Sequence, residues 1–520
     1  MKRRNFVKNV SLASFGVPFV FNNMKFETIS KKLFNVPKNM EDRVLVIIRL
    51  NGGNDGLNTI VPIDQYDNLI IQRTNVILPE NDLIPIIGDN GMHPVMTGMA
   101  NMINDGNLSI IQNVGYPEQN RSHFRSMDIW TSGMMDPAEN TGWLGRHFSV
   151  DHPDYPDGYP NSQNEDPFAI SMGYEVSATC QGLMANFSHS VVDPFQVSNL
   201  PNSGAVNDGT YYGSHMEYLH GIIEQTNEYG DQINDAANAG NNLSTLYDAN
   251  SDLAEQLKNV ALMISGGLET KVYILNVNGF DTHDNQVVNG DTVNGVHANL
   301  MKEVSDAIYA FQDDMKLLGL EKRVAGMTFS EFGRQIASNG SDGTDHGDAA
   351  PLFLFGDCLE TPLYGQNPTI PNQVTNQAGL PMDVDFRDVY ASILRYWFGV
   401  DDAEVQSMFE HNVTYHSIIG GCNLSVEEQN KNKNSDNYSL VYPNPCGSKA
   451  TLKMNGQGGH AKIEIFDMQG RLMKSVFEGN LTLATHHIPL EVDELKKGTY
   501  SIKIQQQSGV ESVQMIKMRN

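Results

Sequence analysis

Residues 44–56, VLVIIRLNGGNDG, are the stretch that decides the fold. Six of the first seven residues are apolar, which is typical of a strand covered on both faces of a sheet. Asn, Gly and Asp follow at once, so the strand ends in a turn that carries polar side chains. We therefore expect a central strand with candidate ligand groups at its carboxyl end.

Four further apolar runs predict buried strands, and helical patterns separate them. The runs are residues 108–112, 272–277, 324–330 and 352–355. Residues 299–318 carry apolar side chains every three to four positions, and residues 389–398 form a second amphipathic pattern. Strands that alternate with helices predict one α/β domain over residues 42–422, with a mostly parallel sheet and helices on both faces. Residues 151–215, rich in Asp, Pro, Asn, Gly and Ser, are expected to be insertion loops.

The composition limits the class of partner. The 520 residues include 35 Lys and Arg against 62 Asp and Glu, a formal net charge of −27. Such a charge repels phosphate backbones, so nucleic acid is not expected as a partner. No internal run reaches the roughly 18–20 apolar residues that a membrane span needs. The four cysteines, Cys180, Cys358, Cys422 and Cys446, are too far apart in the sequence for a zinc ribbon. The sequence leaves open whether they form one or two disulfides.

The first 30 residues predict an export signal. Residues 1–8, MKRRNFVK, are basic, and residues 10–21 are apolar. About a dozen apolar residues are too few to span a membrane, and this order is typical of a signal peptide. The RRNFVK order resembles a twin-arginine signal, whose receptor exports folded proteins. A general secretory signal and a tail anchor are the alternatives.

The C-terminal part of the chain changes character. Residues 423–439 are almost without apolar side chains and predict a linker. Short alternating runs with turn signals follow over residues 440–520, which predicts a small all-β sandwich. The expected strands are residues 450–454, 462–466, 488–492, 500–504 and 514–518.

This C-terminal segment resembles the sorting domain of the type IX secretion system in Bacteroidota. The matching residues are YPNP at 442–445, IFDMQGR at 465–471, the LxxGxY pattern at 495–500 and the basic end at 517–519. The resemblance implies export through the periplasm and outer membrane to the cell surface or the medium, often with removal of the tail. It also implies the type IX machinery as a partner and association with the outer-membrane surface. A carbohydrate-binding sandwich is the alternative.

Polar clusters lie beside each predicted strand of the main domain. Four follow a strand, at residues 51–56, 121–124, 279–284 and 331–334, and one precedes a strand, at residues 343–348. Ligands of open α/β sheets bind beyond the carboxyl ends of the strands. We therefore expect these clusters to share one edge of the sheet.

The residue types in these clusters favour metal chemistry. Asp281 and His283, two apart on a loop, and His346 are candidate ligands, since Zn²⁺ takes imidazole nitrogen and carboxylate oxygen. Loop capping by Asp281 and His283 is the alternative. The Gly-rich 51–56 stretch suits an oxyanion or metal contact, or is a plain turn.

Three further residues fit ester chemistry at such a centre. A Ser122 hydroxyl bound to a metal can lose its proton and act as nucleophile, although a helix N-cap is the alternative role. Arg121 and Arg334 can fork onto the oxygens of a phosphate or sulfate. These three side chains are the candidate catalytic residues.

The main domain resembles the exported family called domain of unknown function 1501, itself similar to the alkaline phosphatase and sulfatase superfamily. The matching stretches are RLNGGNDG at 49–56, RSHF at 121–124, WLGR at 143–146, GFDTH at 279–283, SEFGR at 330–334, DHG at 345–347 and DFRDVY at 385–390. The resemblance implies an alkaline-phosphatase-like fold. It also implies one metal on Asp281, His283 and His346.

The resemblance implies a second metal as well, held by Asn51 or Asp55 together with Ser122 and Glu331. The chain departs from the superfamily there, because Phe332 cannot ligate and the superfamily's Asp is Glu331. The number of divalent ions, one or two, therefore stays open, and zinc is the expected metal.

The expected function is metal-dependent hydrolysis of a phosphate or sulfate ester with Ser122 as nucleophile. The substrate would be an anionic small molecule or a glycan ester. A noncatalytic surface or binding protein that keeps the fold, and a structural envelope component, are the alternatives.

Overall fold

The computed structural model describes residues 19–21, 24–26, 42–197, 200–201, 208–375, 377–420, 422, 440–442, 446, 448–455, 458–467, 471–482, 485–506 and 509–517. The chain forms two compact units, residues 1–423 and 424–520. Residues 19–21 and 24–26 are paired antiparallel strands, β1 (Phe19–Phe21) and β2 (Met24–Phe26). The twin-arginine motif and the linker at residues 423–439 lie outside the described residues.

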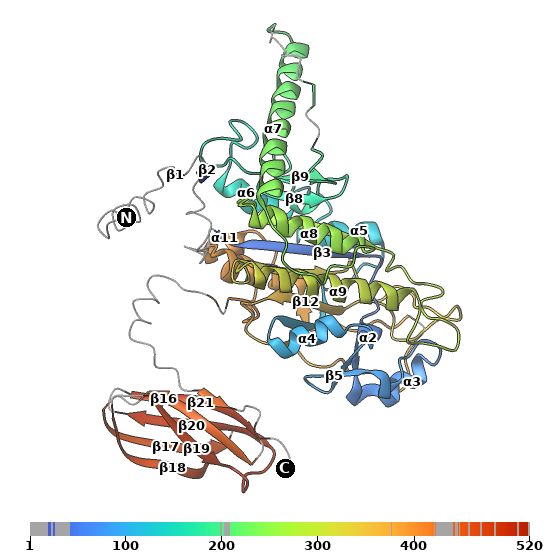
Figure 1. The fold of residues 1–520 in the computed structure, drawn as a ribbon. Helices are drawn as coiled ribbons and strands as arrows, with labels where there is room; N and C mark the ends of the chain where they lie inside the picture. The colour runs from blue at the N-terminus through green and yellow to red at the C-terminus, as the bar shows by residue number, and fades with distance from the viewer. Residues whose placement is uncertain are drawn as a thin grey trace, which may run out of the picture. The chain divides into compact units, whose positions relative to one another are not determined.

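A mostly parallel sheet forms the centre of the first unit (Figure 1). Its strands are β3 (Val44–Asn51), β7 (Leu108–Gly115), β8 (Ala169–Met172), β9 (Ser188–Val191), β10 (Val272–Asn278), β11 (Val324–Phe329), β12 (Ala350–Gly356), β13 (Leu363–Tyr364) and β14 (Val384–Asp385). The strand order is β13-β7-β12-β11-β3-β10-β8-β9, and β14 pairs with β7. The strand at residues 44–51 is therefore central, as its apolar run predicts.

One strand, β12, runs against both of its neighbours, whereas the other pairs of this sheet are parallel. Its amino end therefore lies at the sheet edge where β7, β10, β11 and β3 have their carboxyl ends. The polar cluster at residues 343–348 precedes β12 and so reaches the same edge as the clusters that follow the other strands.

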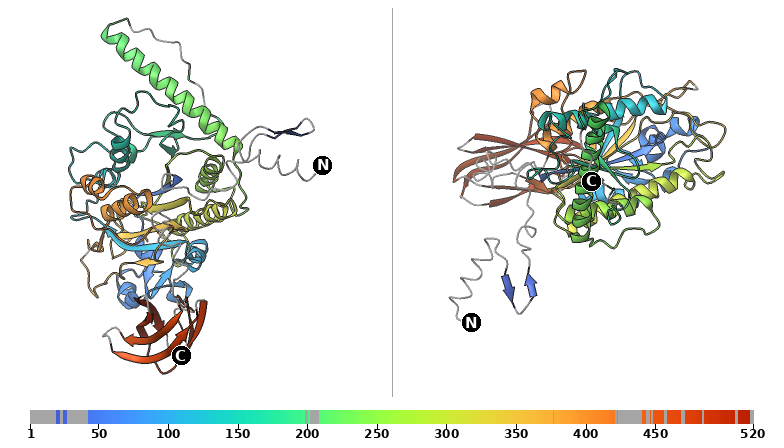
Figure 2. Two further views of the ribbon diagram at one scale, coloured as in Figure 1. Left: turned by 90° about the vertical axis from the view of Figure 1, so that its left-hand side faces the viewer. Right: turned by 90° about the horizontal axis from the view of Figure 1, so that it is seen from above.

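Helices cover both faces of the sheet, which confirms the expected class (Figures 1 and 2). Side chains of β3 alternate between two cores: Val46 and Ile48 pack into one, Leu45 and Ile47 into the other. The helices on the Val46 side are α4 (Thr97–Asp105), α8 (Asp252–Ser265), α9 (Val296–Leu317) and the end of α7 (Tyr211–Ala239). Those on the other side are α5 (His123–Ser132), α6 (Trp143–Asp151), α10 (Phe386–Ser392) and the π-helical η6 (Ile393–Phe398).

The prediction of insertion loops over residues 151–215 is wrong in part. The segment contains β8, β9 and the 3-10 turn η5 (Ala178–Cys180), and the two strands extend the central sheet beyond β10. Each strand is four residues long, which is too short to give a strand pattern among polar neighbours. The first half of α7 extends beyond the layers of the sheet (Figure 2).

A second, smaller sheet lies within the same unit, in the order β4-β6-β5. Its strands are β4 (Ile60–Pro62), β5 (Ile84–Ile86) and β6 (Asn90–Met92). The remaining helices are α2 (Gly56–Thr59), η3 (Ile63–Gln65), α3 (Tyr66–Gln72), η4 (Glu80–Asp82) and α11 (Asp402–Ser407). Among the described residues, no helix combines the length and apolar character that crossing a membrane requires.

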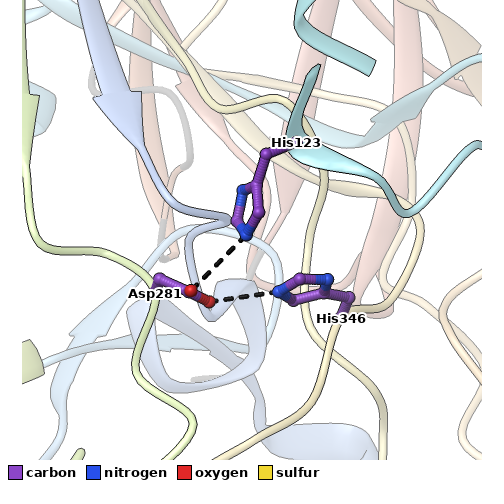
Figure 3. A group of neighbouring side chains, drawn as sticks. All are labelled: His123, Asp281 and His346. Atoms are coloured by element: carbon purple, nitrogen blue, oxygen red, sulfur yellow. Dashed lines mark hydrogen bonds and ion pairs between the residues drawn. The ribbon is translucent and has the colours of Figure 1, made fainter. Parts of the chain in front are cut away.

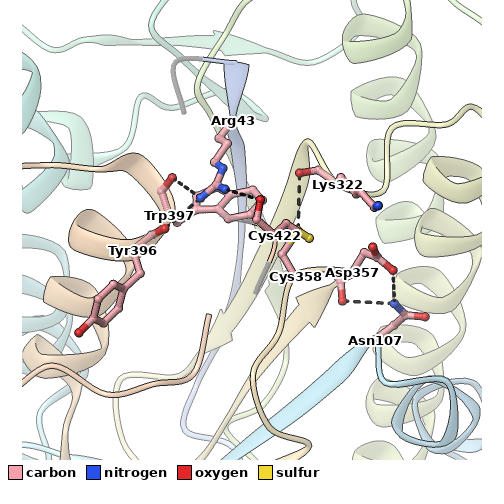
Figure 4. The surroundings of a disulfide bond; sticks show 9 residues. Arg43, Asn107, Lys322, Asp357, Cys358, Tyr396, Trp397 and Cys422 are labelled. Carbon is pink, nitrogen blue, oxygen red and sulfur yellow. Dashed lines mark hydrogen bonds between the residues drawn. A yellow bond between two sulfur atoms is a disulfide. The ribbon is translucent and has the colours of Figure 1, made fainter. Parts of the chain in front are cut away.

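A disulfide joins Cys358 and Cys422 and closes the end of the first unit (Figure 4). Arg43 supports this end, since its Nη1 donates to the carbonyls of Tyr396 and Trp397, both at 2.9 Å. Its guanidinium also lies 4.4 Å from the centre of the Trp397 ring. A disulfide fits an exported protein, because oxidising compartments keep such bonds.

Removing this disulfide is expected to lower the free energy of unfolding of the first unit by about 2–4 kcal/mol. The bond spans 64 residues, so it restricts a long loop in the unfolded chain. Urea unfolding of the Cys358→Ala/Cys422→Ala variant measures the change. Reduced wild-type protein is the control and should match the variant, and equal midpoints for variant and oxidised wild type would contradict the expectation.

The second unit is an antiparallel sandwich, as predicted. One sheet has the order β15-β16-β19 and the other the order β18-β17-β20-β21. The strands are β15 (Leu440–Tyr442), β16 (Lys449–Asn455), β17 (Gly459–Asp467), β18 (Leu472–Leu481), β19 (Thr485–Glu491), β20 (Gly498–Gln506) and β21 (Gly509–Lys517). Leu452 and Leu490 of the first sheet share one core with Ile463 and Ile502 of the second. Strands β15 and β18 were not predicted.

Candidate metal centre

Four side chains from three separate segments meet at the carboxyl edge of the central sheet. His123 is the first residue of α5, Asp281 and His283 follow β10, and His346 precedes β12. Figure 3 shows the rings of His123 and His346 both pointing toward Asp281, the first from above and the second from the right. The structure thus brings together Asp281, His283 and His346, the ligand set predicted from the sequence, and adds His123.

Three of these side chains, Asp281, His283 and His346, have atoms with the mutual spacing of metal ligands. The Nε2 atoms of His283 and His346 lie 2.9 Å apart, and they lie 3.2 and 3.1 Å from Asp281 Oδ1. His123 Nε2 lies 3.4 Å from Asp281 Oδ2. Ligands about 2.0–2.1 Å from a tetrahedral zinc ion lie about 3.3 Å from one another.

The other ring nitrogen of each imidazole faces an acceptor. His123 Nδ1 lies 2.7 Å from Glu331 Oε1 and His283 Nδ1 lies 3.0 Å from Asp345 Oδ1. His346 Nδ1 lies 2.9 Å from the carbonyl of Arg121. Carboxylates and carbonyls accept hydrogen bonds, so each Nδ1 can carry the ring proton, which leaves the Nε2 of a neutral ring free to bind a metal.

The close approach of these nitrogen atoms to one another and to Asp281 fits a cation. At 2.9 Å the Nε2 atoms of His283 and His346 either share one proton as a hydrogen bond or face one cation together. The carboxylate of Asp281 adds negative charge at the same point. Three imidazole nitrogens and a carboxylate are the donor set that suits zinc.

The surroundings of Asp281 and His346 favour the forms of these two side chains that bind a metal. Burial raises the pKa of Asp281, but hydrogen bonds from Arg334 and His346 outweigh this effect and hold the pKa below its ordinary value. Burial also lowers the pKa of His346, which favours the neutral ring. The side chains of Asp281 and His283 remain 46 % and 43 % exposed, so a substrate can reach this centre from solvent.

Glu331 supports the centre from behind. Its carboxylate is buried and accepts from the backbone N–H of Gly52 at 2.9 and 3.2 Å, besides facing His123 Nδ1. The structure therefore gives Glu331 the role of orienting His123, in place of the predicted direct bond to a metal. Phe332 packs beside the same rings, with centroids 4.9 Å from His123 and 4.5 Å from His346.

The other predicted ligands of a second metal lie apart from these imidazoles. Asp55 is buried against Arg73 at 2.8 Å and accepts from Gln286 at 2.6 Å. Asn51 accepts from Arg49 Nε at 2.7 Å and donates to Asn278 at 2.8 Å. Both side chains are hydrogen-bonded to other residues of the protein, and neither belongs to the four-residue centre.

The two arginines predicted to hold an anion are engaged by the protein. Arg334 is fully buried and donates to Asp281 Oδ1 at 2.7 Å. Its remaining donors meet carbonyls of Gly52, Gly53, Phe280 and Thr344 at 2.5–2.8 Å. Arg121 forms a two-pronged ion pair with Asp348 at 2.8 and 2.7 Å. The structure thus makes Arg334 a clamp on the loops, in place of an anion contact.

Gly52 lets two of these loops approach closely. Its φ of +125° is a conformation that side chains other than glycine rarely adopt. A Cβ at this position would lie 2.2 Å from the backbone nitrogen of Asp281. The glycine in the first motif therefore allows the loop after β3 to pack against the loop after β10.

Ser122 is the N-cap of α5, and its side chain is exposed. Its hydroxyl makes no hydrogen bond within the described part of the chain. His123 beside it is the candidate ligand that sequence reasoning missed, because the RSHF stretch was read for its serine and arginine. The signal was present, since the clusters after residue 278 and before residue 350 each also contribute a histidine.

Two family models match the chain. Residues 220–410 match the family described as protein of unknown function (DUF1501), and residues 440–518 match the secretion system C-terminal sorting domain. A search of curated proteins finds no match. The sorting domain indicates export to the cell surface or the medium and implies the secretion machinery as a partner.

Solved structures similar to this chain include members of the alkaline phosphatase and sulfatase superfamily. A superfamily protein from Vibrio parahaemolyticus is 8 % identical, with 98 % of this chain and 88 % of that chain covered and a TM-score of 0.30. The sulfatase PsFucS1 from Pseudoalteromonas sp. is 10 % identical, with 87 % and 84 % covered and a TM-score of 0.29.

A third similar structure is PorZ, a surface component of the type IX secretion system of Porphyromonas gingivalis. It is 16 % identical over 16 % of this chain, with a TM-score of 0.12, and the match spans only 11 % of PorZ. The family models thus match part of each unit: residues 220–410 match the DUF1501 family, and residues 440–518 match the secretion system C-terminal sorting domain.

Proposed function

We propose that this exported protein is a metal-dependent hydrolase of phosphate or sulfate esters. The observation that carries the proposal is the convergence of three imidazole Nε2 atoms on Asp281, with each Nδ1 held by an acceptor. A divalent ion, zinc by donor type, would be held by His123, Asp281, His283 and His346. When bound, the ion supplies a Lewis acid that polarises an ester oxygen.

The chain's own residues prepare this centre. Arg334 fixes Asp281 Oδ1 through a hydrogen bond, and Glu331 fixes the ring of His123. The ring of Phe332 gives the centre an apolar wall, which strengthens the electrostatic interactions beside it. These contacts keep the ligand atoms in place before a substrate arrives.

Ser122 is the proposed nucleophile. Its exposed hydroxyl has no partner in the described chain and stands next to the ligand His123. A hydroxyl that must lose a proton to attack an ester needs a nearby positive charge or base. The neighbouring metal centre would supply that charge.

A second candidate function is a noncatalytic surface protein that binds the metal without turnover. The engagement of both arginines and the position of Phe332 favour it, because neither a free guanidinium nor a second set of ligands faces the centre in the described residues. Both candidates predict bound metal, and only the first predicts hydrolysis.

The full chain loaded with zinc should hydrolyse p-nitrophenyl phosphate or p-nitrophenyl sulfate, and Ser122→Ala should lower kcat about 1,000-fold or more. Ser214→Ala, an exposed serine on α7, is the matched control and should keep wild-type kcat. Bound zinc without hydrolysis of either ester would support the noncatalytic candidate. Hydrolysis that survives Ser122→Ala would exclude this serine as nucleophile.

A further inference from the structure

The middle of the chain carries side-chain charges of one sign. Between Arg146 and Lys258 the sequence contains 16 Asp and Glu residues and no Lys or Arg. The segment includes β8, β9 and the long helix α7. A surface region with negative charges and no cations of its own attracts positively charged partners and repels negatively charged ones.

Acidic side chains form a stripe along one exposed face of α7. Glu217, Glu224, Glu228, Asp231 and Asp235 are all exposed, and they follow one another at intervals of seven, four, three and four residues. Because a helix turns about 100° per residue, these intervals place the five carboxylates within about 40° of one line along the helix. At 1.5 Å per residue, the acidic stripe is about 27 Å long.

Two cavities lie along this stripe. The first has a volume of about 560 Å³, and its acidic lining residues are Glu217, Glu224 and Glu228 of α7 and Asp157 of the facing loop. The second has a volume of about 780 Å³, and its acidic lining residues are Asp235 of α7, Asp42, Glu165, Asp166 and Glu269. Lys271 is the single basic residue in the two linings. A partner on the stripe therefore meets carboxylates from α7 and from the segments beside it.

An unpaired acceptor lies in the first cavity. Gln225 is only 6 % exposed and lines this cavity, and its Nε2 faces the carbonyls of Tyr159 and Pro156 at 3.3 and 3.5 Å. This contact leaves Oε1 without a donor in the described chain. The oxygen is not among the unpaired atoms that are sealed from solvent, so a donor in the cavity can reach it. Since buried polar groups are almost always paired, Oε1 indicates a ligand with N–H groups.

Exposed apolar side chains accompany the acids on the first half of α7. Tyr211, Tyr212, Tyr218 and Leu219 are each more than half exposed, and Tyr218 lines the first cavity. The face of a tyrosine ring attracts a cation, and its body packs against apolar groups. In the part of the chain that the structure describes, the carboxylates of the stripe do not form a group that could hold a metal ion. The surface therefore suits a partner with both cationic and apolar side chains.

We infer that the acidic stripe of α7 and its two cavities bind an extended, basic segment of another polypeptide. Lysine and arginine side chains supply charges for the carboxylates and N–H groups for Gln225 Oε1, while apolar side chains of the same segment cover the tyrosines. About eight residues of extended chain span the 27 Å of the stripe. A second copy of this chain would bring the same carboxylates and would be repelled. None of these residues belongs to the metal centre, so the inference does not depend on the proposed hydrolysis.

The test is fluorescence anisotropy of the rhodamine-labelled peptide KLKSKLKSKL with the full chain. The peptide should bind with a Kd near or below about 100 μM at roughly 20 mM salt. Because exposed charges are screened, the affinity should fall at least about 5-fold at roughly 200 mM salt. The matched peptide ELESELESEL carries the opposite charge and should not bind.

Variants of exposed residues locate the binding surface. Glu224→Lys/Glu228→Lys replaces two attractions by two repulsions and should weaken binding of the lysine peptide about 30-fold. Glu80→Lys/Asp82→Lys on the exposed η4 changes the net charge equally, is the matched control and should weaken binding no more than about 3-fold. Tyr218→Ala should weaken binding about 3-fold, whereas Tyr174→Ala, at a tyrosine that lines neither cavity, should have no effect. Urea midpoints equal to that of the wild type show that each variant is folded.

Three outcomes would overturn the inference. Equal losses for the two double variants would show that the peptide senses only the net charge of the chain. Absence of binding at roughly 1 mM of the chain would remove the site altogether. Spermine that displaces the peptide at equal concentration would indicate a polyamine site, because a polyamine supplies the charges without the apolar side chains.

Discussion

Replacing His346 by alanine is expected to lower zinc affinity by more than about 100-fold, which is at or beyond the range found for residues that only support a ligand. His346 Nε2 lies 2.9 Å from His283 Nε2 and 3.1 Å from Asp281 Oδ1. Its removal takes away one ligand of four and leaves the remaining lone pairs without a common partner. Isothermal titration of the metal-free full chain with zinc measures the change.

The control for this prediction is His215→Ala, because His215 is an exposed histidine on α7. It should bind zinc as the wild type does, with one ion per chain. Equal zinc affinity for His346→Ala and the wild type would remove His346 from the centre.

Replacing Arg334 by methionine should destabilise the first unit by about 3–5 kcal/mol. The guanidinium is fully buried and satisfies the Asp281 carboxylate and four carbonyls from three loops. Methionine fills part of the space but leaves those acceptors buried without donors. Urea unfolding of the purified variant measures the loss.

Two further variants make the Arg334 prediction specific. Arg334→Lys keeps the charge but not the forked geometry, so an intermediate loss is expected, which also covers the case in which the methionine variant does not fold. Lys302→Met removes the exposed ion pair with Asp306 and should cost no more than about 1 kcal/mol. An unchanged midpoint for Arg334→Met would show that the clamp contributes nothing to stability.

The sequence predicted the sheet well because buried parallel strands are long and continuously apolar. β3, β7, β10, β11 and β12 all contain the expected runs. The reversed direction of β12 was not predicted, because strand direction depends on pairing with β7 and β11, which no local pattern encodes. The four-residue strands β8 and β9 carry too few side chains for a periodic signal.

The candidate site was predictable where residues of ligand type stand in loops at the ends of predicted strands. Asp281, His283 and His346 stand in polar loops at strand ends, and the structure brings them together. Arg334 stands in an equally polar loop, yet its partners are carbonyls of distant segments, which residue types do not reveal. A sequence shows that an arginine is near a site, and only the fold shows what its donors meet.

The same limit applies to the cysteines and to Glu331. Four separated cysteines left the pairing open, and the structure pairs Cys358 with Cys422. Glu331 was expected to bind a metal, but the approach of Gly52 and His123 turns its carboxylate into their acceptor.

X-ray absorption at the zinc edge on the zinc-loaded full chain tests the central claim most directly. The claim is that His123, Asp281, His283 and His346 hold one metal ion. The account predicts one zinc per chain with nitrogen and oxygen neighbours at about 2.0–2.1 Å and the multiple-scattering pattern of imidazole rings. Failure to retain zinc, or sulfur neighbours at about 2.3 Å, would contradict it.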